Sequence, residues 1–206
     1  MKKAHLLIIA VLALSAGFIV SWIVSDSKPV KLEAGLWFGD QAKILPDFQL
    51  LDHNNQTLDK SELSGKWNLM FFGYTHCPDI CPTSLQTLSD MLNAIDDIDV
   101  RRKVQIIFIS VDPDRDTPAI LKTYVQYFHP DLIGASAPLP KLNRLTGVIG
   151  IAHSRDKITG NQTVYGVSHS SAIALLNPEV EFAGLFRAPH DGHAMARDLV
   201  KIIERN

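Results

Sequence analysis

Apolar residues follow two kinds of spacing along the chain, and each kind predicts a different element. Continuous apolar runs at residues 67–74 and 104–111 have the length of a strand and predict two buried strands. Apolar residues at helical spacing predict helices at residues 83–97, 118–128, 139–145 and 192–204. Turn residues between shorter β-rich runs predict a hairpin at residues 48–58 and strands at 149–153, 164–168, 171–176 and 182–186.

The order of these elements is strand, helix, strand, helix, followed by a hairpin and a terminal helix. This order is typical of an α/β domain whose central strands are parallel and whose late strands pair antiparallel. We therefore expect a thioredoxin-like fold, in which a central mixed sheet is flanked by helices. In that arrangement a pair of cysteines follows a central strand and lies at the start of a helix.

The N-terminus has a different pattern, because no charged residue occurs from Leu6 to Val24. An apolar stretch of this length predicts a single transmembrane anchor at residues 1–25. It is long for a signal peptide and lacks a small-residue cleavage motif, so an uncleaved anchor is favoured, with cleavage as the alternative. Residues 26–45 read as a polar tether, although Trp37 and Phe38 would suit packing on the domain, and residues 46–206 form the exported domain.

Lys2 and Lys3 precede the apolar stretch, so the positive-inside rule leaves the N-terminus in the cytoplasm. In a bacterium the anchor would lie in the inner (cytoplasmic) membrane and the functional domain in the periplasm. The net charge of −2 argues against a nucleic-acid partner. The basic run at residues 101–103 is more simply a solvated helix end.

The candidate chemistry lies at Cys77 and Cys81, the two cysteines of the chain. Such a pair can cycle between dithiol and disulfide, hold a soft metal ion, or close a loop. Loop closure is the weakest interpretation, because a cross-link over so short a loop stabilises little. A helix N-terminus favours anions, so we expect a lowered thiolate pKa here, with Pro78 and Pro82 keeping the segment from forming one regular helix.

The three-residue spacer between the cysteines can present both sulfurs to one ion, and two thiolates with an imidazole would suit Cu(I). His76 adjoins Cys77, but a neighbouring side chain points away from a site as readily as toward it. His169 lies between two β-rich runs, where a hairpin would swing it toward a helix end, and it is the first candidate. Other histidines at element ends have an ordinary explanation as solvated or core-packed rings: His129, His153, His190 and His193.

Several motifs resemble the Sco/SenC proteins, which are membrane-anchored, thioredoxin-fold copper chaperones. They are residues 73–82 (Gly-Tyr-Thr-His-Cys-Pro-Asp-Ile-Cys-Pro), 110–118 (Ser-Val-Asp-Pro-Asp-Arg-Asp-Thr-Pro), 165–170 (Tyr-Gly-Val-Ser-His-Ser) and 45–48 (Leu-Pro-Asp-Phe). The resemblance implies that Cys77, Cys81 and His169 bind a copper ion and that the two cysteines form a redox-active disulfide. It further implies a cuproprotein client, cytochrome c oxidase subunit II, whose CuA centre would receive copper, have its cysteines reduced, or both.

The chain also departs from the family pattern. Ser168 stands where the family usually has Asp, which removes a carboxylate from beside the expected ligand His169. Residues 133–137 differ from the usual Leu-Thr-Gly segment, and residues 178–180 lack the usual turn glycine. In the second motif we expect Asp112, Arg115 and Asp116 to brace a loop, with the arginine held between carboxylates.

A second function class remains open, a metal-independent thiol–disulfide oxidoreductase or redox sensor that uses Cys77 and Cys81 alone. A purely structural, membrane-tethered module is hard to reconcile with an accessible dithiol. The two leading hypotheses differ at His169, because a reductase does not need a distant imidazole and a Cu(I) site does.

Overall fold

The computed structural model describes residues 5, 15, 17, 18, 31–156 and 165–205. The chain divides into two compact units, Met1–Lys31 and Leu32–Asn206. The predicted anchor at residues 1–25 falls almost wholly outside the described residues. Within the described part, no helix combines the length and the apolar character that crossing a membrane requires.

The second unit is built on a mixed nine-stranded sheet with the order β1-β11-β10-β5-β6-β7-β3-β4, in which β2 also pairs with β11. The central neighbours β5, β6 and β7 are parallel, and the flanking pairs are antiparallel. A separate two-stranded sheet joins β8 and β9. The strands are β1 Gly35–Trp37, β2 Lys43–Ile44, β3 Gln49–Asp52, β4 Thr57–Asp59, β5 Trp67–Gly73, β6 Val104–Ser110, β7 Ile133–Ser136, β8 His153–Arg155, β9 Val167–His169, β10 Ile173–Leu176 and β11 Glu181–Phe186.

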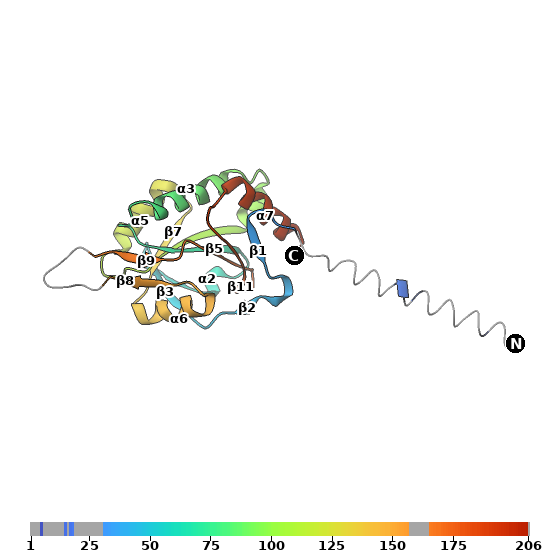
Figure 1. Cartoon of the computed structure of the whole chain (residues 1–206), viewed down its shortest axis with the longest axis horizontal. Coiled ribbons are helices and arrows are strands. Elements are labelled where there is room, and N and C mark those ends of the chain that lie inside the picture. Colours follow the sequence, from blue (N-terminus) through green and yellow to red (C-terminus); the bar gives the residue numbers. More distant parts are fainter. Residues whose placement is uncertain (1–4, 6–14, 16, 19–30, 157–164, 206) are drawn as a thin grey trace. The chain divides into compact units, whose positions relative to one another are not determined.

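Helices cover both faces of the large sheet, with α3, α5 and α7 along one face and α6 on the other (Figure 1). This layout confirms the predicted α/β architecture of a mixed sheet flanked by helices. The helices are η1 Gly39–Gln41, α2 Lys60–Leu63, α3 Ile80–Asn93, α4 Ile98–Arg102, α5 Pro118–Phe128, α6 Leu139–Ile149 and α7 Gly192–Arg205.

Strand β5 shows why the sheet is buried on both sides. Its side chains alternate, so Leu69 and Phe71 pack under α3, α5 and α7, whereas Met70 and Phe72 pack against α6. Every residue of β5 is buried, which explains its continuous apolar sequence. The carboxyl end of this central strand is where the cysteine loop begins.

The folded unit begins earlier than the sequence predicted. Strands β1 and β2 lie in the segment expected to be a tether, and both pair with β11. Phe38 packs edge-on against Phe182, with ring centroids 5.2 Å apart. The predicted domain start at residue 46 is therefore too late, and the alternative that Trp37 and Phe38 join the domain is confirmed.

Two other expectations are wrong in detail. Helix α6 continues to Ile149 and ends at Gly150, whose φ of 79° is the left-handed conformation of a helix cap. The strand predicted at residues 149–153 therefore starts only at His153. The central parallel strand β7 was not predicted at all, because its sequence Ile-Gly-Ala-Ser has few strand-favouring residues.

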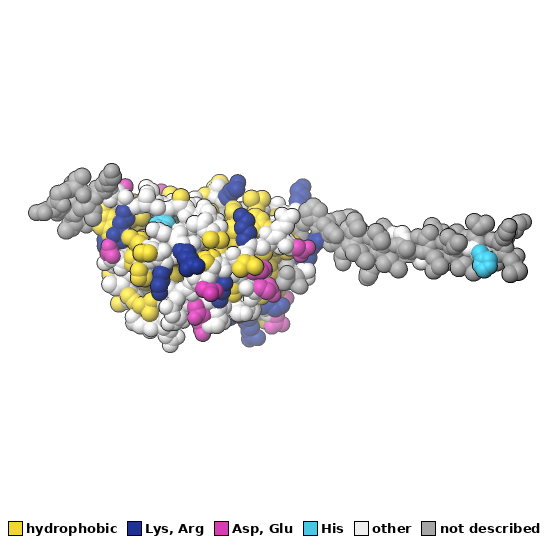
Figure 2. Space-filling model, turned by 90° about the horizontal axis from the view of Figure 1, so that it is seen from below, with side chains coloured by type: hydrophobic (Ala, Val, Ile, Leu, Met, Phe, Trp, Pro, Cys, Tyr) yellow, Lys and Arg dark blue, Asp and Glu magenta, His cyan; other side chains and the backbone are white. Residues whose placement is uncertain are grey.

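The surface of the domain mixes its charges. On the face drawn in Figure 2, Lys and Arg side chains are interspersed with acidic and hydrophobic ones and do not gather into one basic surface. The basic residues Arg101 and Arg102 lie in the last turn of α4. This position agrees with the expected helix end, where positive charge stabilises the helix dipole.

Candidate metal centre

The cysteine loop connects the carboxyl end of β5 to the first turn of α3. Cys77 lies in the loop, and Cys81 is the second residue of the helix. The backbone N–H of Cys81 donates to Cys77 Sγ at 3.4 Å. Pro82 also lies inside the helix, which is contrary to our expectation. The helix tolerates it because residues of the first turn have no intrahelical partner for their N–H groups, so a proline there loses no hydrogen bond.

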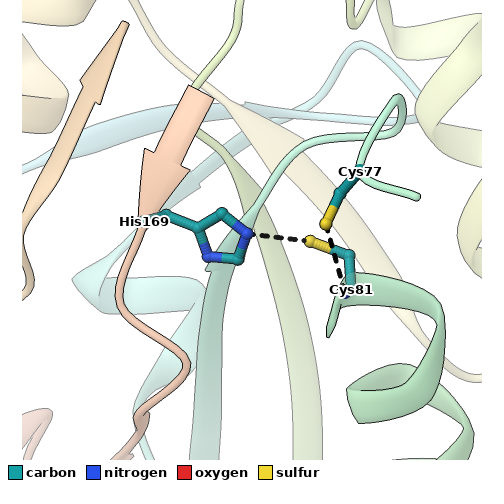
Figure 3. Close-up of side chains that lie close together, drawn as sticks. All are labelled: Cys77, Cys81 and His169. Atoms are coloured by element: carbon teal, nitrogen blue, oxygen red, sulfur yellow. Dashed lines mark hydrogen bonds between the residues drawn. The ribbon is translucent and has the colours of Figure 1, made fainter. Parts of the chain in front are cut away.

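The third side chain arrives from β9, far away in the sequence. His169 Nε2 lies 3.2 Å from Cys81 Sγ, and its ring points at that sulfur in Figure 3. The ligand atoms of Cys77, Cys81 and His169 all lie within 4.8 Å of one another. The structure therefore brings together the three residues that the family resemblance implied, in an arrangement that one ion could share.

The imidazole of His169 is held in one orientation. Its Nδ1 lies 3.1 Å from the carbonyl oxygen of Ser170, a contact that places the ring proton on Nδ1 and leaves the Nε2 lone pair facing Cys81. Tyr74 and Phe71 pack edge-on against the ring, with centroids at 5.8 and 6.0 Å. Burial lowers the pKa of His169, which favours the neutral form that can bind a metal.

The two thiols have different environments. Cys81 is fully buried and Cys77 is half-buried, and both are free thiols. Burial raises the pKa of the Cys81 thiol above its ordinary value of 9, so the expected lowering at the helix N-terminus is wrong for this residue. A bound cation would reverse this preference, because coordination deprotonates a thiol.

The loop after β6, residues 111–117, braces the cysteine loop through Asp116. This carboxylate is buried and accepts hydrogen bonds from the Thr75 backbone N–H at 2.9 Å and from Thr75 Oγ1 at 2.6 Å. It also accepts a hydrogen bond from Ser110 Oγ. Thr75 lies two residues before Cys77, so Asp116 helps to set the path of the loop that carries the first sulfur.

The same loop braces the β8–β9 hairpin through Asp112. The buried Asp112 carboxylate accepts hydrogen bonds from Arg155 Nη2 at 2.8 Å and from Tyr165 Oη at 2.6 Å. Arg115 donates to Asp112 and to the Tyr165 carbonyl, and its guanidinium lies 3.8 Å from the Tyr165 ring centroid. The bracing role is as expected, but Arg115 does not lie between two carboxylates. It contacts Asp112 and Tyr165, whereas Asp116 accepts hydrogen bonds from Thr75.

Two of the residues considered from the sequence lie outside the cluster. His76 is exposed, and its Nδ1 faces Thr75 Oγ1 at 3.1 Å and not the sulfurs. Ser168 is also exposed, because it lies on the outer face of the hairpin while its neighbour His169 points inward. A carboxylate at position 168 would accordingly lie on the exposed face of the hairpin, opposite to the face that carries His169.

Sequence reasoning missed one histidine near the site. His153 pairs directly with His169 across the β8–β9 hairpin. Burial and the neighbouring His169 lower the pKa of His153. From the sequence it was interpreted as an ordinary solvated or core-packed ring, because only the register of the hairpin places it beside His169.

The chain is similar over most of its length to a set of related proteins. The sequence profile of the SCO1/SenC family matches residues 39–204. A protein of Stutzerimonas stutzeri, named as copper-binding, is 32% identical over 182 residues, which are 88% of each chain. The mitochondrial SCO2 homolog of Mus musculus is 38% identical over 160 residues, which cover 78% of this chain and 61% of the mouse protein.

Solved structures agree with the sequence comparison. The crystal structure of Arabidopsis thaliana ScoI with copper bound has a TM-score of 0.71 at 31% identity and covers 79% of this chain and 99% of that one. Yeast Sco1 with copper bound has a TM-score of 0.72 at 28% identity, covering 79% and 89%. The predicted thioredoxin-like fold is thereby confirmed, and the chain belongs to the SCO1/SenC family.

Proposed function

We propose that this chain is a copper-binding metallochaperone that acts in assembly of the CuA centre of cytochrome c oxidase. The main support for this proposal is that Cys77, Cys81 and His169 converge, with their ligand atoms within 4.8 Å of one another. Two thiolates and one imidazole are a donor set that suits the soft ion Cu(I). Membership of a family with copper-bound relatives from Arabidopsis thaliana and yeast supports this choice of metal.

The unequal burial of the three ligands suits an ion that is held and then passed on. Cys81 is fully buried, and its sulfur lies 3.2 Å from His169 Nε2. Cys77 is half-buried in the connecting loop, so an incoming ligand of a client can replace it first. Copper would leave by stepwise ligand exchange that begins at Cys77, while Cys81 and His169 still hold the ion.

The same dithiol can also reduce a client. The Cys77 thiolate would attack a disulfide of the client, which forms a mixed disulfide and releases one client thiolate. Cys81 would then attack the Cys77 sulfur of the mixed disulfide and release the second client thiolate. The two electrons move to the client, which gains two thiols, and a Cys77–Cys81 disulfide remains on this chain. In this role the client is the same one, cytochrome c oxidase subunit II, whose CuA cysteines must be reduced before they bind copper.

The proposed setting follows from the N-terminal sequence. The uncharged stretch from Leu6 to Val24, preceded by Lys2 and Lys3, supports a single-pass anchor in the inner membrane with the copper domain in the periplasm. An oxidising compartment would form the Cys77–Cys81 disulfide unless a reductant acts on it.

Copper titration of the reduced chain, with metal analysis, tests the proposal. Wild type should retain one Cu(I) against a competing chelator, and Cys77→Ser and Cys81→Ser should each lose it. His169→Ala should weaken retention by about 10–100-fold without unfolding the domain. The matched control is His76→Ala, which should retain copper because the converging ligand atoms belong to Cys77, Cys81 and His169. If His76→Ala loses copper while His169→Ala keeps it, the ligand assignment is wrong.

The alternative is a metal-independent thiol–disulfide oxidoreductase. The half-buried, free thiol of Cys77 favours it, because such a thiol is open to exchange. The position of His169, with Nε2 3.2 Å from Cys81 Sγ, opposes it, because a reductase does not need a distant imidazole. Reduction of a model disulfide at equal rates by wild type and His169→Ala, together with no copper retention by either, would favour this alternative.

A further inference from the structure

The register of the β8–β9 hairpin gives His153 a position beside the candidate metal centre. His153 pairs with His169, and the hydrogen-bonded positions flank this pair. Ser170 N–H donates to the Ala152 carbonyl at 2.9 Å, and Asp156 N–H donates to the Gly166 carbonyl at 3.0 Å. Because hydrogen-bonded and non-hydrogen-bonded pairs alternate along antiparallel strands, His153 and His169 form a non-hydrogen-bonded pair, the closer kind.

Both imidazoles also lie on the same face of the hairpin. His153 and Arg155 are partly buried while Ser154 between them is exposed, and Val167 and His169 are covered while Ser168 is exposed. Directly opposed residues share one face, so the inward face of β8 and β9 carries both histidines. The inward direction of His169 is toward the sulfurs (Figure 3).

No hydrogen bond among the described residues fixes the orientation of the His153 ring. Throughout residues 31–156 and 165–205, no hydrogen bond holds either of its ring nitrogens, whereas Nδ1 of His169 is tied to Ser170. Arg155, two residues further along the same face, is fixed by Asp112 and Asp114 at 2.8 and 2.6 Å. Ion pairs of Arg155 thus anchor strand β8 close to His153, and β9 places a candidate ligand opposite it. Among the described residues, no polar group holds the His153 ring itself.

We propose that His153 is a fourth ligand of this site and binds when the site holds Cu(II). The inference rests on the proposed copper function and extends it to the second oxidation state of the ion. Cu(I) is satisfied by the trigonal set of Cys77, Cys81 and His169, whereas Cu(II) prefers a four-coordinate, tetragonal arrangement. A second imidazole on the inward face of the hairpin supplies that fourth position from within the chain.

The general spacing of cross-strand side chains makes a side-chain movement sufficient for this binding. His153 stands outside the group whose ligand atoms lie within 4.8 Å of one another. Directly opposed side chains have Cβ atoms about 4.5–5.5 Å apart. At metal–nitrogen distances of about 2 Å, two nitrogens on one ion are at most about 4 Å apart, so the two rings need only lean together. A rotation of the unbound His153 ring provides this approach without a change in the hairpin register.

A ligand that serves only one oxidation state shifts the redox potential of the ion. If His153 strengthens Cu(II) binding by about 10–100-fold and leaves Cu(I) binding unchanged, the Cu(II)/Cu(I) potential falls by about 59–118 mV. Removing His153 should raise the potential by that amount. A merely structural role for His153 would change both affinities together and would leave the potential where it is.

The test compares His153→Phe with wild type in the full chain. Phenylalanine keeps an aromatic ring at the hairpin and removes both nitrogens, and Ser154→Ala on the outer face is the matched control for the hairpin. The chain, labelled with ¹⁵N-histidine, is mixed with less than one equivalent of Cu(II), frozen at once and studied by pulsed EPR. We expect two coupled imidazoles in wild type and Ser154→Ala, and one in His153→Phe, with Cu(I) affinity within about threefold of wild type because the trigonal set is intact.

The outcomes separate this inference from the proposed function. If wild type fails to retain Cu(I), the proposed function itself is wrong. If Cu(I) is retained but wild type and His153→Phe show the same number of coupled imidazoles and the same potential, only the role of His153 is wrong. Immediate loss of the EPR signal would also overturn it, because Cys77 and Cys81 would then have given one electron to each of two Cu(II) ions and formed a disulfide.

Discussion

Gly73, the last residue of β5, lies against the sulfur of Cys81. A Cβ atom at this position would stand 2.5 Å from Cys81 Sγ and 2.8 Å from Cε2 of the Phe108 ring. Both neighbours are fully buried and have little room to move. Because residue 73 has no side chain, the Cys81 sulfur can pack against the end of β5. In this position the sulfur lies 3.2 Å from His169 Nε2.

We expect Gly73→Ala to impair both the site and the fold. The added methyl group must displace the sulfur or the Phe108 ring, which should destabilise the domain by about 1–3 kcal/mol. Displacement of a ligand should also weaken Cu(I) retention by about 10-fold or more. Urea unfolding and chelator competition measure the two effects.

The control for Gly73→Ala is Gly147→Ala, which adds the same methyl group within α6. Apart from the neighbouring residues and the backbone of the same helix, no atom lies within 4 Å of the added Cβ there. Alanine should stabilise this helix interior by up to about 1 kcal/mol and leave copper retention unchanged. Unchanged copper retention in Gly73→Ala would show that the Cys81 sulfur does not need its present position.

The protonation states of two ligands predict how copper binding depends on pH. The pKa of Cys81 is raised by burial, so Cu(I) must displace a proton from it throughout the neutral range. For that one proton, the apparent affinity should rise by about tenfold for each unit of pH. The pKa of His169 is lowered from 6.5 by burial, so its proton competes with the metal only in more acidic solution.

The advantage of wild type over His169→Ala should therefore be complete above pH 6.5 and shrink as the pH falls through the lowered pKa of His169. Chelator competition between about pH 5 and pH 8 measures both affinities. An advantage that stays constant across this range would mean that His169 does not bind through its neutral ring.

At the scale of elements, one loop holds the two halves of the site in place. The segment between β6 and α5 binds the cysteine loop through Asp116 and the β8–β9 hairpin through Asp112. The cysteines and His169 come from distant parts of the chain, so their meeting depends on this shared support. Both carboxylates are buried, which makes the loss of either set of hydrogen bonds costly.

We expect Asp116→Asn to loosen the cysteine loop. The amide keeps the shape but turns one acceptor into a donor, so one of the hydrogen bonds from Thr75 or Ser110 is lost. The variant should be destabilised by about 1–3 kcal/mol. It should bind Cu(I) about 10-fold more weakly or worse. Urea unfolding and copper competition provide the measurements.

Asp114→Asn is the matched control in the same loop. Its side chain is 69% exposed and pairs with Arg155 at the surface. Such a pair contributes at most about 1 kcal/mol, and copper retention should not change. Equal effects of the two substitutions on copper would mean that the loop does not act through Thr75.

The elements that the sequence predicted well are those whose pattern is local. Helix α5 has the predicted bounds because Pro118 opens it and the Thr117 side chain caps it. Strand β7 escaped prediction because tertiary packing determines it: Gly134 lets α5 approach, and a Cβ there would lie 3.0 Å from the Leu121 side chain. The local pattern Ile-Gly-Ala-Ser does not reveal that this segment pairs with β6 on one side and β3 on the other.

The residues of the site also differ in whether the local sequence is enough to identify them. Cys77 and Cys81 are only four positions apart in the sequence, so their spacing alone was enough to identify them. His169 was assigned through a family resemblance, because only the folded chain brings it to the sulfurs. His153 was missed, since a shift of one residue in the hairpin register would turn it to the opposite face.

For the molecule as a whole, the start of the folded unit is tied to its last helix. Asp198 of α7 is fully buried, and its carboxylate accepts hydrogen bonds from the backbone N–H groups of Glu33, Ala34 and Gly35 at 2.7–3.0 Å. Glu33 in turn pairs with Arg197 and Lys201, and these hydrogen bonds lower its pKa to about 2. The segment before β1 therefore supplies partners that a buried carboxylate requires.

This dependence predicts where the domain can be shortened. A fragment of residues 32–206 should unfold cooperatively in urea, whereas a fragment of residues 46–206 lacks β1 and β2 and leaves the Asp198 carboxylate buried without its backbone donors. Lys201 Nζ still lies 3.9 Å from Asp198 Oδ1 in the shorter fragment, but each lost hydrogen bond to this charged group costs about 1.5–3 kcal/mol, so the fragment should be destabilised by about 3 kcal/mol or more, or fail to fold. Asp198→Asn in the longer fragment isolates the contribution of the carboxylate, and it should lose about 1–3 kcal/mol. Equal urea midpoints for the two fragments would show that the domain begins at residue 46 after all, and that the segment around Glu33 adds nothing to its stability.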